Sequence, residues 1–67
     1  MRDRLERLVA EMVERGILFE DALHAFERTF IAQVLARTDG NLSEAARELH
    51  IHRNTLARKI AEHKLRK

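Results

Sequence analysis

Residues 39–64 place two short helical patterns on either side of a tight turn, and this arrangement constrains the fold most. The stretch reads DGNLSEAARELHIHRNTLARKIAEHK. The first pattern follows Asn41, a residue type favoured as a helix N-cap, with Glu44 three positions later as in a capping box. Two short helices joined by a tight turn are typical of a helix-turn-helix, whose second helix enters the major groove of DNA.

The apolar residues of this stretch predict where the two helices bury their faces. The first helix, expected over 42–49, has two alanines on its inward face, where a crossing helix backbone requires small side chains. We assign the crossing to Ala46. The second helix, expected over about 53–63, has Leu56 and Ile60 four positions apart on its buried side. The turn, residues 50–52, contributes Ile51 to the core.

Upstream residues predict two longer amphipathic helices. From about residue 3 to 15 the apolar positions trace one helical stripe, which ends at Gly16 in a pattern typical of a left-handed cap. A second helix should begin near Phe19 or Glu20 and close at Gly40. All three phenylalanines, at 19, 26 and 30, are expected in a core. The apolar residues assigned to the core or to a dimer interface are Leu5, Leu8, Val9, Met12, Leu23, Phe26, Phe30 and Val34.

The chain has 67 residues and no cysteine, so neither length nor disulfides give it much stability. A chain this short buries only about 60% of the surface that its unfolded form exposes. The first helix could pack inside its own domain or on another copy of the chain. We favour the second copy, because it is the remaining source of buried area.

Composition and charge indicate the class of partner. The chain is 45% hydrophobic and 36% charged, with no proline, which favours an all-helical domain. Residues 1–36 carry a net charge of −2, and residues 37–67 carry +4. The C-terminal half is therefore expected to meet a polyanion. No apolar run approaches the roughly 20 residues of a membrane span, and a cytoplasmic, nucleoid-associated location is expected.

Polar side chains on the second helix of the 39–64 stretch have the chemistry to read base edges. An arginine can bond to guanine and an asparagine to adenine, and a threonine can contact a thymine methyl group. The residues assigned to base contacts are His52, Arg53, Asn54 and Thr55. Cations and helix N-terminal polar groups bind phosphates without reading sequence. The residues assigned to phosphate contacts are Asn41, Ser43, Arg58, Lys59 and Lys64.

Four other interpretations compete with DNA binding. The cationic face could be an ordinary solvated surface, and the amphipathic helices could form an interaction module that binds no DNA. A metal site could be imagined from Glu48, His50 and His52, but no second ligand pair accompanies them. No nucleophile or pair of acids suggests an enzyme. We therefore predict no catalytic residue, no metal and no cofactor.

The residues GNLSEAA at 40–46 and IHRNTLARKI at 51–60 resemble the helix-turn-helix of the Fis family, named for the factor for inversion stimulation. They are equally similar to the C-terminal DNA-binding domain of NtrC-type enhancer-binding activators, and the RNTLARK segment is closer to that type. The resemblance covers about residues 38–62 well and 19–37 more loosely. Little beyond a helix in the expected place is recognisable over 1–18.

The resemblance implies an intertwined homodimer whose two recognition helices lie closer together than one DNA turn, so that bound DNA bends. Carried over by position, the family's base and backbone contacts fall on Asn41, Ser43, His52, Arg53, Thr55, Arg58 and Lys59. Two residues depart from the pattern: His50 stands where a turn glycine is usual, and Ala57 stands where Fis has an arginine. No counterpart of the mobile arm of Fis precedes the first helix, so stimulation of recombination is not expected.

The sequence thus predicts an all-α, four-helix protomer over residues 1–67, with dimerisation helices at 3–38 and a helix-turn-helix at 39–64. The expected function is that of a sequence-selective, homodimeric Fis-like transcriptional regulator of bacteria, with double-stranded DNA as its partner. The alternative is the DNA-binding domain of an NtrC-type activator, for which RNA polymerase or an activator ATPase domain would be a further partner. The sequence does not separate these two alternatives.

Overall fold

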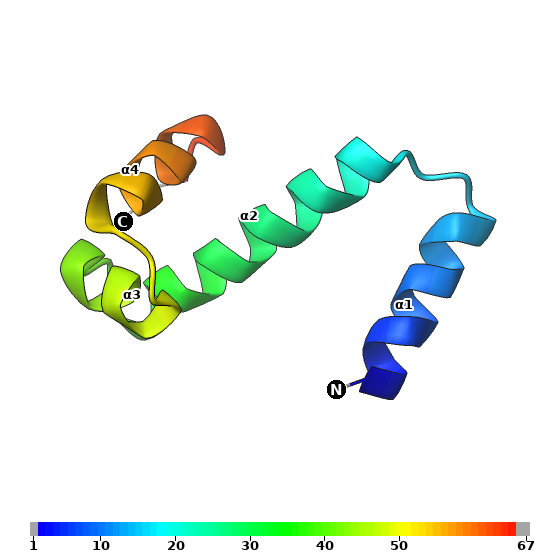
Figure 1. Ribbon diagram of the computed structural model, residues 1–67, viewed down its shortest axis with the longest axis horizontal. Coiled ribbons are helices and arrows are strands. Elements are labelled where there is room, and N and C mark those ends of the chain that lie inside the picture. Colours follow the sequence, from blue (N-terminus) through cyan, green and yellow to red (C-terminus); the bar gives the residue numbers. More distant parts are fainter. Residues whose placement is uncertain (1, 66–67) are drawn as a thin grey trace.

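The computed structural model describes residues 2–65 and contains four helices (Figure 1). Their bounds are α1, Arg2–Glu14; α2, Phe19–Arg37; α3, Leu42–Leu49; and α4, Arg53–Glu62. No strand occurs in this part of the chain, so the predicted all-α class is confirmed. The helices of the 39–64 stretch also begin and end where the sequence predicted.

All four helices end in the same way, with one residue in the left-handed region. The residue after it donates its N–H to a carbonyl five positions back, which satisfies an otherwise unpaired helix carbonyl. The four N–H···O pairs are Ile17 to Met12 (3.1 Å), Gly40 to Leu35 (2.8 Å), Ile51 to Ala46 (3.1 Å) and Leu65 to Ile60 (3.0 Å). The left-handed residues before these donors are Gly16, Asp39, His50 and Lys64.

The end of α2 differs in detail from the prediction that Gly40 closes it. Asp39 takes the first left-handed position, with φ 57°, and Gly40 follows with φ 77°. Aspartate tolerates this conformation better than most residues because its short polar side chain can bond locally. Two successive residues with positive φ turn the chain sharply from α2 into α3.

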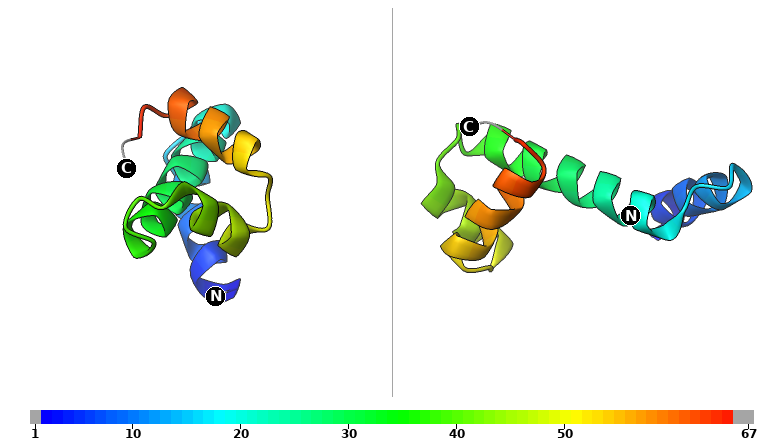
Figure 2. Two further views of the ribbon diagram at one scale, coloured as in Figure 1. Left: turned by 90° about the vertical axis from the view of Figure 1, so that its left-hand side faces the viewer. Right: turned by 90° about the horizontal axis from the view of Figure 1, so that it is seen from above.

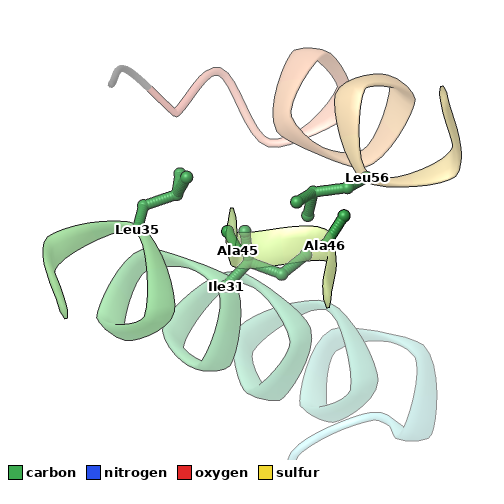
Figure 3. Close-up of a cluster of buried hydrophobic side chains, with 5 residues drawn as sticks. All are labelled: Ile31, Leu35, Ala45, Ala46 and Leu56. Carbon is green, nitrogen blue, oxygen red and sulfur yellow. The ribbon is translucent and has the colours of Figure 1, made fainter. Parts of the chain in front are cut away.

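A small core joins the last part of α2 to α3 and α4. Its five buried side chains are Ile31, Leu35, Ala45, Ala46 and Leu56, which converge from the three helices (Figure 3). Ala45 and Leu56 are fully enclosed, and Ala46 is 4% exposed. Both alanines are therefore buried among the three helices, which extends the assignment made for Ala46 alone. Leu65 also packs against this core, and residues 66 and 67 lie outside the described range.

Helix α1 has no buried residue in the protomer, and it projects from the N-terminal end of α2 (Figures 1 and 2). Within the protomer, the expectation that the phenylalanines are core is wrong, since Phe19, Phe26 and Phe30 are 74%, 56% and 48% exposed. The reason is that the helix-turn-helix covers only the C-terminal part of α2. Among the other residues assigned to core or dimer, Leu5, Leu8, Val9 and Leu23 are exposed, Met12 is half-buried, and Val34 packs on the core.

Candidate nucleic-acid interface

Local hydrogen bonds define the start of α3, and a left-handed residue defines the turn between α3 and α4. Asn41 caps α3, because its Oδ1 accepts from the backbone N–H of Glu44 at 3.0 Å. The Asn41 N–H itself donates to the carbonyl of Thr38, so the reciprocal half of a capping box is not formed. His50 then adopts φ 57° and ψ 41°, a conformation that histidine adopts with some strain where glycine would have none.

His52, which was assigned to base contacts, also caps the N-terminus of α4. Its Nδ1 accepts a hydrogen bond from the backbone N–H of Asn54 at 3.0 Å and so caps α4. This bond requires an unprotonated Nδ1, which leaves Nε2 as the ring nitrogen that can meet DNA. A proton on Nδ1 would be incompatible with this cap.

The predicted base-reading residues lie together at the start of α4. His52, Arg53 and Asn54 are exposed, whereas Thr55 is half-buried. No acidic residue occupies the first turn of α4, so nothing there opposes the positive end of the helix dipole. The start of α4 therefore presents a guanidinium, a carboxamide and an imidazole to solvent on a rigid helix.

The predicted phosphate-binding residues divide into two groups. Asn41, Ser43, Arg58 and Lys64 are exposed. Lys59 differs, because its side chain is only 30% exposed and its Nζ lies 2.8 Å from Oε2 of Glu27 on α2. The geometry therefore gives the Lys59 ammonium an intramolecular partner.

Glu27 is the centre of a polar cluster that sequence reasoning missed. Its Oε1 lies 2.7 Å from Nε2 of His63, whose side chain is 1% exposed. The ring of His24 packs against that of His63 at 4.3 Å between centroids, with the two planes tilted by 52°. The hydrogen bond from Lys59, followed by that from His63, holds the pKa of the Glu27 carboxyl below its ordinary value. One signal was available: His63 follows Leu56 by seven positions and Ile60 by three, so it lies on the same buried helix face.

Other kinds of site find no support among residues 2–65. No group of three or more acidic or histidine side chains there could hold a metal ion, and Glu48, His50 and His52 are not brought together as ligands. None of the helices in this range is long and apolar enough to cross a membrane.

A capped short helix, a tight left-handed turn and a second helix with an exposed cationic face define a helix-turn-helix domain. Residues 22–63 match the family model described as "Bacterial regulatory protein, Fis family". The match covers more than half of the chain, and the chain belongs to this family of DNA-binding transcriptional regulators.

A curated relative supports the same assignment. The chain is 49% identical over 45 residues to the DNA-binding transcriptional regulator NtrC of Proteus hauseri, a match that covers 67% of this chain and 10% of the relative. The chain thus spans about a tenth of the length of that protein. No solved structure gives a significant match.

Proposed function

We propose that the chain binds DNA as a homodimer with sequence selectivity and bends the duplex that it binds. The observation that carries this proposal is the exposed polar and cationic start of α4 on a helix-turn-helix scaffold. Arg53 would bond to guanine and Asn54 to adenine in the major groove, with His52 and Thr55 beside them. Asn41, Ser43, Arg58 and Lys64 would hold the phosphates on either side.

The exposed apolar face of the first two helices supports the homodimer. Leucine, valine and phenylalanine side chains along α1 and α2 are 41–74% exposed, and contiguous apolar faces of this kind are normally covered by a partner. A second copy presents the same face, so a symmetric pairing would bury both at once. The protomers would then carry two recognition helices at a fixed separation, and a separation shorter than one DNA turn would require bent DNA.

Salt dependence of binding to random duplex DNA is the first test. Each lysine or arginine that neutralises a phosphate adds about 0.9 to the slope of log affinity against log salt concentration. We expect a steep decline. Absence of binding at low salt would instead favour an interaction module that binds no DNA. Sedimentation velocity should give twice the protomer mass, and a monomer at all concentrations would refute the dimer.

Sequence selectivity is tested by comparing Arg53→Ala with Arg58→Ala. We expect Arg53→Ala to weaken a selected site by about 1–3 kcal/mol and to relax its sequence preference, because the variant cannot form the bidentate bond to guanine. Arg58→Ala should weaken all sequences about equally and lower the salt slope. If the two variants behaved alike on selected and random duplexes, the division between base and phosphate contacts would be wrong.

A second candidate is the DNA-binding domain of an NtrC-type activator, favoured by the 49% identity to NtrC over 45 residues. In that case the domain would hold an activator ATPase domain at its DNA site or contact RNA polymerase there. Mapping bound sites across a genome separates the candidates. Sites clustered upstream of few promoters favour the activator, and many dispersed sites favour an architectural Fis-like regulator.

A further inference from the structure

Glu27 uses both oxygens of one carboxylate to join α2 to α4. Oε2 lies 2.8 Å from Nζ of Lys59, and Oε1 lies 2.7 Å from Nε2 of His63. The two partners are 32 and 36 residues away in sequence and one helical turn apart on α4. We call Glu27, Lys59 and His63 the α2–α4 clamp.

The clamp adds a polar attachment between α2 and α4 to the apolar contacts of the core. Leu56 holds α4 on Ile31 and Leu35, which lie one and two turns further along α2 than Glu27. Ile60 and Leu65 pack against the same core, so the apolar contacts continue along α4 and into the segment that follows it. Apolar contacts are not directional, whereas the two hydrogen bonds to Glu27 at the C-terminal end of α4 fix the angle between α4 and α2.

The buried histidine distinguishes the clamp from a surface ion pair, while the side chains of Lys59 and Glu27 are 30% and 38% exposed. The side chain of His63 is 1% exposed, and its Nδ1 is buried without a hydrogen-bond partner among the described residues. Because Nδ1 has no hydrogen bond among the described residues, the position of the ring depends on the hydrogen bond between Nε2 and Glu27 and on packing against His24. Charge-assisted hydrogen bonds of this length are stronger than neutral ones.

The clamp also lies beside the apolar face that we assign to the dimer. Glu27 directly follows Phe26, and successive residues of a helix point about 100° apart. Phe26 is exposed while Glu27 turns to α4, so one turn of α2 carries both the candidate dimer contact and the tie to the recognition helix. In a dimer formed through α1 and α2, the orientation of α4 that the clamp fixes would set the separation of the two recognition helices.

We propose that Glu27 is a positioning residue that sets the half-site spacing read by the dimer, and that Lys59 is an internal tie and not a phosphate ligand. This inference rests on the proposed function of dimeric DNA binding. It assigns the spacing preference to one carboxylate on α2, outside the helix-turn-helix itself.

The test uses the full chain and duplexes with two copies of a half-site selected from a random pool, separated in steps of one base pair. Affinity for each spacing is measured at fixed salt for the wild type, Glu27→Ala and Glu27→Gln. Glu27→Gln keeps the side-chain volume and one acceptor oxygen, so it serves if Glu27→Ala does not fold. Glu62→Gln, an exposed carboxylate on α4, is the matched control for the change in charge.

We expect the wild type and Glu62→Gln to share one preferred spacing. In the Glu27 variants, the affinity ratio between the preferred and neighbouring spacings should fall by about tenfold, the equivalent of one charge-assisted hydrogen bond. Equal weakening of all spacings would mean that Glu27 contributes only to stability, and it would overturn the inference. A Glu27 variant that folds and keeps the wild-type spacing profile overturns the inference and leaves the proposed function intact.

Salt dependence on random duplex tests Lys59 independently. Lys59→Met should leave the slope of log affinity against log salt concentration unchanged, while Arg58→Met should lower it by about 0.9 for each phosphate that the arginine neutralised. Equal reductions in the two variants would make Lys59 a phosphate ligand and overturn its assignment to the clamp. A wild-type chain that binds no duplex at low salt would refute the proposed function, and the inference with it.

Discussion

Leu56 is the side chain whose loss should damage the fold most, because it is the largest side chain that the core encloses completely. It extends from α4 toward Ala45 and Ala46 of α3 and the two buried residues of α2 (Figure 3). Leu56→Ala removes three carbon atoms, worth about 0.8 kcal/mol each, and leaves a cavity that adds to the loss. The expected destabilisation is about 3 kcal/mol.

That loss is large for a chain of this size. At the usual range per residue, a domain this small has a free energy of unfolding of roughly 3–10 kcal/mol. The measurement is urea unfolding followed by far-UV circular dichroism. Wild type and variant are compared at one protein concentration, because association makes the midpoint depend on concentration. Glu62→Ala, at an exposed position of the same helix, controls for the effect of an added alanine on α4.

A loss below about 1 kcal/mol, with an unchanged dependence on urea, would refute this reasoning. It would mean that the helix-turn-helix does not depend on Leu56 for contact between α4 and the other two helices. A loss equal to that of Glu62→Ala would lead to the same conclusion.

Three further predictions concern the turn, a cap and the clamp. His50→Gly should raise stability by about 1 kcal/mol by relieving the left-handed strain, and an unchanged or lower urea midpoint would contradict this. Asn41→Ala should cost about 1 kcal/mol while Asn41→Asp keeps the cap; equal midpoints for the two would contradict the cap's contribution. The hydrogen bonds from Lys59 and then from His63, whose ring packs against that of His24, lower the pKa of the Glu27 carboxyl. The stability that these bonds contribute is therefore complete above the pKa of this carboxyl in the unfolded chain. It is lost as the pH falls through the pKa of the carboxyl in the folded chain. Glu27→Gln should therefore flatten the acid decline of the urea midpoint, and an unaltered decline would exclude Glu27 as its source.

The helices of this protein and the type of domain that they form could be predicted from the sequence. The bounds of α3 and α4, the Asn41 cap and the His50 turn follow from interactions within a few residues, which periodicity and capping patterns report directly. The motif at 40–60 also indicated the family, because the crossing of two helices requires its small residues and its turn spacing.

Which apolar stripes form the protomer's own core became evident from the packing of the helices. Periodicity gives the apolar face of a helix but not what covers it, so Phe26 and Phe30 matched a core pattern although they are exposed in the protomer. The clamp also could not be predicted from the sequence, since Glu27 and His63 are 36 residues apart and meet only because α3 returns the chain to α2. The sequence presented Lys59 as one cation among several, and the fold gave it a carboxylate partner.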